Sequence, residues 1–148
     1  MRALLSVLVI LVASLSLQAQ LTIDQLRARM QQSSGGNKAK FAMQIAAMRV
    51  EQASTEFNAG QSDKGHDLIR EATELVRVAG DASLEANKKV KDTEISVRKL
   101  ERRLQEIHRS VSFDDQDEID ESLKMISVVR NQLLDRMFSL DKEDKKKK

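Results

Sequence analysis

The sequence contains no cysteine, proline, tryptophan or tyrosine, and only five of its 148 residues are glycine. Without cysteine the fold has no disulfide, no thiol nucleophile and no lipid attached through a thiol. Four phenylalanines are its only aromatic residues, which argues against a sugar-binding or base-stacking surface. Because proline and glycine are the residues that most often interrupt helices, their scarcity favours long helices held together by side-chain packing alone.

The charges are abundant but balanced. Charged residues make up 32% of the chain, and the net charge is only +2 at pH 7. Five lysines lie in the last eight residues, 141–148, and outside this tail and Arg2 the chain has 19 basic and 20 acidic residues. A uniformly basic surface of the kind that binds nucleic acid is therefore not expected.

The first residues resemble a targeting signal. Met-Arg is followed by an apolar run over residues 3–17, and this order is typical of a secretory signal peptide, with Ala19 as the small residue before the cleavage site. The run is shorter than the roughly 20 residues that a membrane-spanning helix needs. We expect residues 1–19 to be a signal peptide and the chain to be periplasmic or secreted. An uncleaved, membrane-tethered form is the alternative.

A heptad repeat over residues 69–111 is the most regular pattern in the chain. Its a positions are Ile69, Val76, Ser83, Val90, Val97, Leu104 and Val111, and its d positions are Ala72, Ala79, Ala86, Thr93, Leu100 and Ile107. One unbroken register of this length predicts a single helix over about residues 62–111 with a packed seam. Gly80 before Asp81 is the one candidate for a helix end within this segment, because Gly often closes a helix and Asp opens the next.

Two further helices are expected, over about residues 38–59 and 115–140. Asn37 is a candidate N-cap of the first, and Gly60 suits the left-handed position that follows its end. The last helix carries one apolar stripe that contains Arg130. We expect this arginine either to extend its charged end to solvent or to pair with Glu94, and a ligand-binding arginine is the less favoured alternative. The sequence thus predicts an all-α fold, a long central helix with an antiparallel helix folded onto each half as coiled-coil-like hairpins.

The helix over residues 38–59 has two apolar faces. Phe41 lies on one of them, and Met43, Val50 and Phe57 lie roughly opposite at 100° per residue. A helix with two apolar faces needs two partners. One is the first half of the long helix, and the other is either the N-terminal helix or a second copy of the chain. We therefore expect Phe41, Met43, Val50 and Phe57 to bind a protein partner.

Residues 20–37 read as a short helix followed by a Ser/Gly linker. Thr22 and Gln25 have the spacing of a capping box. The run Leu21-Thr22-Ile23-Asp24-Gln25 also resembles the Leu-Thr-x-x-Gln element of the Spy-type periplasmic chaperones, a family that carries this element twice. The resemblance covers five residues and one copy. It implies a small exported helical protein that holds unfolded clients on a concave surface.

The C-terminal part of the chain carries charge of both signs. Acidic residues crowd residues 114–121, where they suit the positive end of a helix dipole better than a calcium-binding loop, which also needs a Gly and a closing Glu. Residues 141–148 contain no apolar side chain and are expected to be disordered. Four terminal lysines either contact an anionic surface or only solvate the chain: Lys145, Lys146, Lys147 and Lys148.

No catalytic constellation is apparent. On one straight helix His66 and His108 would lie more than about 60 Å apart, too far to share a metal, and no phosphate-binding or nucleophile motif is present. We expect no metal, no cofactor, no small-molecule substrate and no enzymatic activity. The sequence favours a non-enzymatic exported interaction or scaffold protein of the bacterial cell envelope, or alternatively a holdase chaperone of the Spy type.

Overall fold

The computed structural model describes residues 23–146, and every regular element in that range is helical. A short N-terminal helix over residues 23–31 precedes α2 (Gly35–Asn58), α3 (Ser62–Ala86), α4 (Val90–Ser110) and α5 (Phe113–Lys146). The all-α prediction is confirmed. The expected signal peptide, and Leu21 and Thr22 of the chaperone-like element, lie outside the described residues. No helix in the described range is long and apolar enough to cross a bilayer.

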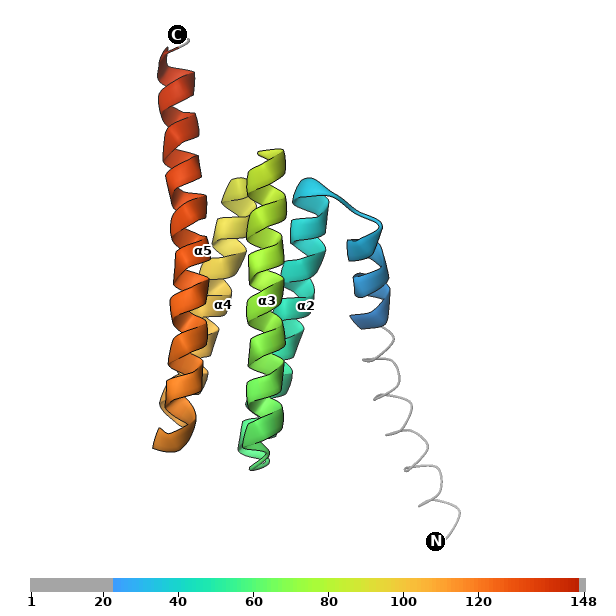
Figure 1. Ribbon diagram of the computed structural model, residues 1–148, viewed down its shortest axis with the longest axis vertical. Helices are drawn as coiled ribbons and strands as arrows, with labels where there is room; N and C mark the ends of the chain where they lie inside the picture. Colours follow the sequence, from blue (N-terminus) through green and yellow to red (C-terminus); the bar gives the residue numbers. More distant parts are fainter. Residues whose placement is uncertain (1–22, 147–148) are drawn as a thin grey trace, which may run out of the picture.

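The four long helices form a bundle of two antiparallel hairpins (Figure 1). In the first hairpin α2 packs along α3, and in the second α4 packs along α5. The hairpins lie against each other so that α3 also contacts α5 and α2 also contacts α4. The expected antiparallel helix on each half of the heptad segment is therefore confirmed.

The prediction of one continuous helix over residues 62–111 is wrong. The chain turns at residues 87–89, where Asn87 and Lys89 have φ angles of 50° and 56°. The amide of Lys88 donates to the carbonyl of Ser83 at 3.1 Å and that of Asn87 donates to Leu84 at 3.1 Å, the two bonds of a Schellman motif. Asn is the non-glycine residue that best tolerates this left-handed position.

The heptad repeat predicted burial correctly although it did not predict continuity. Its positions are buried apart from Ala86 and Val111 at the ends of α3 and α4. Each helix turns its own apolar seam to the core, and the three-residue turn happens to place Val90 seven positions after Ser83. An unbroken heptad register is therefore compatible with a turn of this length as well as with one continuous helix.

Several helix boundaries also differ from expectation. The second helix begins at Gly35, ahead of Asn37. Helix α5 continues to Lys146, so residues 141–146 are helical, whereas we expected them to be disordered. Lysine and glutamate are good helix formers, so a helix already nucleated by packing extends through them. Gly60 does close α2, with φ of 73°, as expected.

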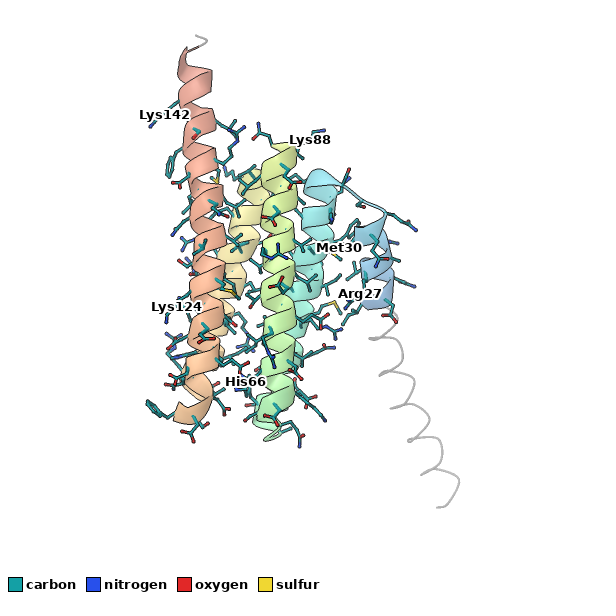
Figure 2. All side chains as sticks on the ribbon, in the orientation of Figure 1. Arg27, Met30, His66, Lys88, Lys124 and Lys142 are labelled. Atoms are coloured by element: carbon teal, nitrogen blue, oxygen red, sulfur yellow. The ribbon has the colours of Figure 1, made fainter. Side chains whose placement is uncertain are left out.

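The N-terminal helix covers the outer side of the first hairpin. Its Ile23 is buried at 4% exposure, and Met30 packs against the same core (Figure 2). Glu71 of α3 accepts a hydrogen bond from Arg27 at 2.6 Å and forms an ion pair with Nε of Arg49 on α2 at 2.8 Å. This carboxylate links three helices. The N-terminal helix is thus a partner within the chain for one apolar face of α2.

The expected partner of Arg130 is also found. Its Nε lies 3.3 Å from Glu94 of α4, and its Nη1 lies 3.1 Å from Glu101. Glu94 is only 3% exposed and also lies 3.6 Å from Arg98. A carboxylate buried this deeply needs such partners, because an unpaired buried charge is strongly destabilising.

Gly80 is a close-approach position and not a helix end. It lies inside α3, and a Cβ atom added there would stand 2.5 Å from Cγ1 of Val129 on α5. Gly80→Ala is therefore expected to lower the free energy of unfolding by about 1 to 2 kcal/mol, since overpacking outweighs the better helix propensity of alanine. Urea denaturation followed by circular dichroism measures this change.

The matched control is the pair Val129→Ala and Gly80→Ala/Val129→Ala. Shortening Val129 removes the atom that meets the new methyl group. The double variant should be destabilised by less than the sum of the two single changes, a coupling of at least about 0.5 kcal/mol. Strict additivity would show that the clash is absent.

Candidate functional site

A groove of about 710 Å³ runs between α2 and α4. Its floor is apolar and comprises Ala39, Met43, Ala47, Val50 and Leu100. Short side chains such as Ala39, Ala47 and Ser96 leave the space between the two helices unfilled, although protein interiors are normally close-packed. The volume lies in the range of ordinary ligand sites, roughly 300–1,000 Å³.

The rim of this groove is mainly basic. Exposed lysines at positions 40, 89 and 99 line it together with two exposed acids, Asp92 and Glu51. Arg103 and Glu51 close one end of the groove with paired hydrogen bonds of 2.8 and 2.9 Å. The groove thus combines an apolar floor with surplus positive charge.

Two of the four predicted partner-binding residues line this groove, and two do not. Met43 and Val50 are 6% and 1% exposed and form part of its floor. Phe41 is half-buried outside the groove, and Phe57 packs edge-on against His66 at 5.0 Å between ring centroids. Sequence reasoning missed the contribution of α4, because a continuous long helix would have carried Leu100 away from α2.

Two of the four lysines proposed to contact an anionic surface lie at the far end of α5. Lys145 and Lys146 belong to its last turn, while Lys147 and Lys148 lie outside the described residues. In Figure 1 this end of α5 extends beyond the other helices of the bundle.

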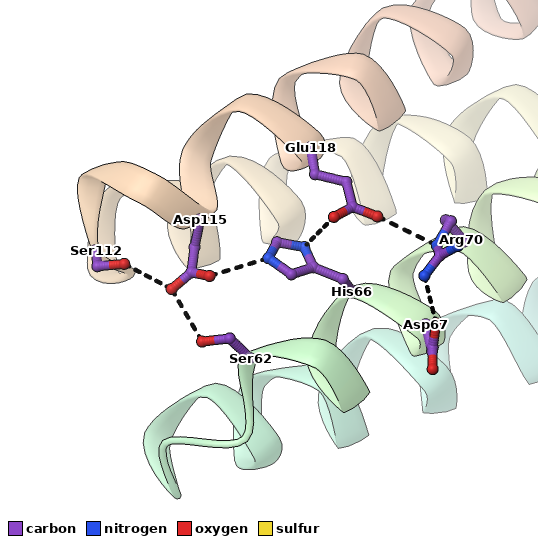
Figure 3. A network of polar contacts seen from close by, with 7 residues as sticks. All are labelled: Ser62, His66, Asp67, Arg70, Ser112, Asp115 and Glu118. Carbon is purple, nitrogen blue, oxygen red and sulfur yellow. Dashed lines mark hydrogen bonds and ion pairs between the residues drawn. The ribbon is translucent and has the colours of Figure 1, made fainter.

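A polar cluster joins α3 to the start of α5 (Figure 3). Asp115 accepts hydrogen bonds from Ser62 at 3.1 Å and from Ser112 at 2.6 Å, and its other oxygen lies 3.0 Å from His66 Nε2. The second ring nitrogen of His66 lies 3.4 Å from Glu118. The carboxylate of Asp115 stands between the imidazole and both hydroxyls, so the imidazole is not placed to take a proton from either serine. This geometry suits a clamp between helices.

The fold brings the two histidines to the same end of the bundle, which corrects the expected separation. His108 lies 3.1 Å from Asp120, five residues along α5 from the partner of His66. The acids at the start of α5 pair with His66, His108 and Arg70. Within the described residues no group of three or more His, Asp or Glu could hold a metal ion.

Hydrogen bonding lowers the pKa values of two carboxylates in these regions. The Ser112 hydroxyl, and after it the His66 imidazole, hold the pKa of Asp115 below its ordinary value. The guanidinium of Arg103 lowers the pKa of Glu51 in the same way and has its own pKa raised. Both effects favour the ionised forms that link α3 to α5 and α2 to α4.

These shifts predict a loss of stability in acid. A carboxylate whose pKa is lower in the folded than in the unfolded state stabilises the fold at pH values above its unfolded pKa. That unfolded pKa is about 3.9 for Asp and about 4.3 for Glu. That contribution disappears as the pH falls through the folded pKa. The free energy of unfolding, from urea titrations, is expected to fall between pH 5.5 and pH 2.5.

Asp115→Asn should remove part of this fall, because an amide does not titrate. Asp24→Asn, at an exposed site on the N-terminal helix, serves as the control and should leave the fall at its full size. An Asp115→Asn variant that loses as much stability in acid as the unaltered protein would contradict the assignment.

Comparisons of the chain with models of protein families, with curated proteins and with solved structures give no match. Its function is therefore inferred from the groove, the charges and the exposed surfaces described above.

Proposed function

We propose that the chain is a non-enzymatic, exported interaction or scaffold protein of the cell envelope, and that it binds an amphipathic helix of a protein partner in the groove between α2 and α4. The observation that carries this proposal is the groove itself, which leaves one side of the bundle without a covering element. Recognition of an amphipathic helix by an apolar groove is a common mode of peptide binding.

The dimensions of the groove suit a helix. Its lining extends from Gly36 to Glu51 on α2, and from Lys89, the residue before α4, to Arg103 on α4. At 1.5 Å per residue both walls are about 21 to 22 Å long, which corresponds to roughly four helical turns. The floor offers apolar contact along this length, while the lysines on the rim would orient a partner with acidic flanks.

Export is supported by the sequence of residues 1–19, with a basic start, an apolar run and a small residue before the cleavage site. Because the chain contains no cysteine, its folding in such a compartment does not depend on a disulfide bond.

Photo-cross-linking at position 47 tests the proposal. Ala47 is exposed and lines the groove, so p-benzoylphenylalanine placed there is expected to give covalent protein adducts when intact cells are irradiated. Lys64, exposed at the start of α3, is the matched control site and should give none. Gel shift and mass spectrometry identify the adducts.

The same samples test export, because the recovered chain should begin at Gln20. A chain that starts at Met1 and stays in the soluble cytoplasmic fraction would contradict export. Equal adducts from positions 47 and 64, or none from position 47, would contradict binding in the groove.

A second candidate function is that of a holdase chaperone, as the short resemblance at Leu21 to Gln25 implies. The observation that favours it is the exposed apolar surface of α5: Phe113 (82%), Met125 (51%), Val128 (57%) and Phe138 (62%). Surfaces of this kind bind unfolded clients through apolar contact.

The holdase proposal predicts that the protein suppresses the aggregation of reduced α-lactalbumin at a near-stoichiometric ratio, measured by light scattering. Phe113→Ser/Phe138→Ser should weaken the effect without unfolding the bundle, since both side chains are exposed. Unchanged aggregation in the presence of the unaltered protein would sink this candidate.

A further inference from the structure

Charge is divided between the two sides of the bundle. The helices α3 and α5, which pack on each other, together carry sixteen acidic and nine basic residues, a difference of seven. The helices α2 and α4, which pack on each other and form the groove, carry nine basic and six acidic residues. One side of the bundle is therefore acidic and the other is basic.

The acidic side carries an exposed stripe along α5 with the spacing of a helix interface. Its residues follow one another at intervals of three or four, and all are exposed: Asp117, Glu121, Met125, Val128, Gln132 and Asp135. Met125 and Val128 form an apolar centre, and acids flank that centre on both sides. Residues at this spacing share one face of a helix, which here faces away from the core.

The basic residues of α3 do not cancel the acidity of this side. Arg70 is paired with Asp67 and lies 3.2 Å from Glu118. Arg77 lies 3.0 Å from Glu74 and 3.3 Å from Asp81. Neither arginine pairs with an acid of the α5 stripe.

We infer that the helix received by the groove is α5 of a second copy of this chain, an inference that rests on the proposed function of the groove. From Glu121 to Asp135 the stripe is about 21 Å long at 1.5 Å per residue, the same length as the groove. Met125 and Val128 lie on the apolar floor, while the flanking acids approach the lysines of the rim. Apolar centre meets apolar centre, and acidic flanks meet basic flanks.

The contact joins two different surfaces, so it is heterologous. A copy that has received a neighbour in its groove still presents its own α5 stripe. Contacts of this kind propagate into open chains or close into rings, and they do not produce a simple two-fold dimer. Through self-assembly of this type the protein acts as a scaffold.

The test is the mass of the chain from Gln20 onward, measured by light scattering across concentration and salt series. The unaltered protein is expected to grow in mass with concentration and to shrink with added salt. Charge reversal of the groove by Lys40→Glu/Lys99→Glu should raise the dissociation constant at least tenfold. Reversal of the stripe by Glu121→Lys/Asp135→Lys should do the same. All four side chains are exposed, and circular dichroism checks that each variant is folded.

Mixing the two reversed variants is the decisive arm. Each variant repels itself, but in an equimolar mixture every groove meets a stripe of opposite charge, so association should return. Lys64→Glu and Asp24→Lys change exposed charges outside both surfaces and should leave association unchanged. Association that survives both reversals, or that does not return on mixing, would overturn the inference.

The outcome separates this inference from the proposed function. A chain that stays monomeric at all concentrations, with position 47 cross-linked to a different protein, overturns self-assembly and leaves the groove as a binding site. A monomeric chain without adducts at position 47 overturns both.

Discussion

The left-handed turn at residues 87–89 is the constraint on which the rest of the structure depends. It ends α3 at Ala86 and sends α4 back along the bundle from Val90. Only because of this reversal does α4 lie beside α2 and form the second wall of the groove. The same reversal returns His108 to the end of the bundle that holds His66, where both histidines meet the acids of α5. A Schellman motif of two backbone hydrogen bonds thus determines the architecture.

The bundle is packed unevenly, and the unevenness leaves a surface for binding. Between α2 and α3 buried alanines such as Ala42, Ala46 and Ala79 allow the two helices to approach closely. Between α2 and α4 short side chains such as Ala39, Ala47 and Ser96 leave a groove. The Arg103–Glu51 pair holds the two walls together at one end.

The separation of acidic from basic residues favours one orientation of a partner that binds in this groove. The near-neutral total of +2 conceals an acidic layer of α3 and α5 and a basic layer of α2 and α4. Long-range attraction between such layers steers encounters and favours one orientation, while apolar contact supplies most of the affinity. A protein of this design suits assembly, either with itself or with a partner whose exposed helix resembles its own α5.

The sequence by itself determined the all-helical fold, the buried seam of α3 and α4, the partner of Arg130 and the left-handed end at Gly60, because each follows from local periodicity or from a single short-range preference. Tertiary structure alone decided that the seam folds back on itself, that Gly80 accommodates Val129, and that Met43 and Val50 meet Leu100 in one groove. Those outcomes depend on which helices become neighbours. A periodic pattern states that a face is buried, but it does not state what buries it, and a turn that preserves the heptad spacing leaves no trace in the pattern.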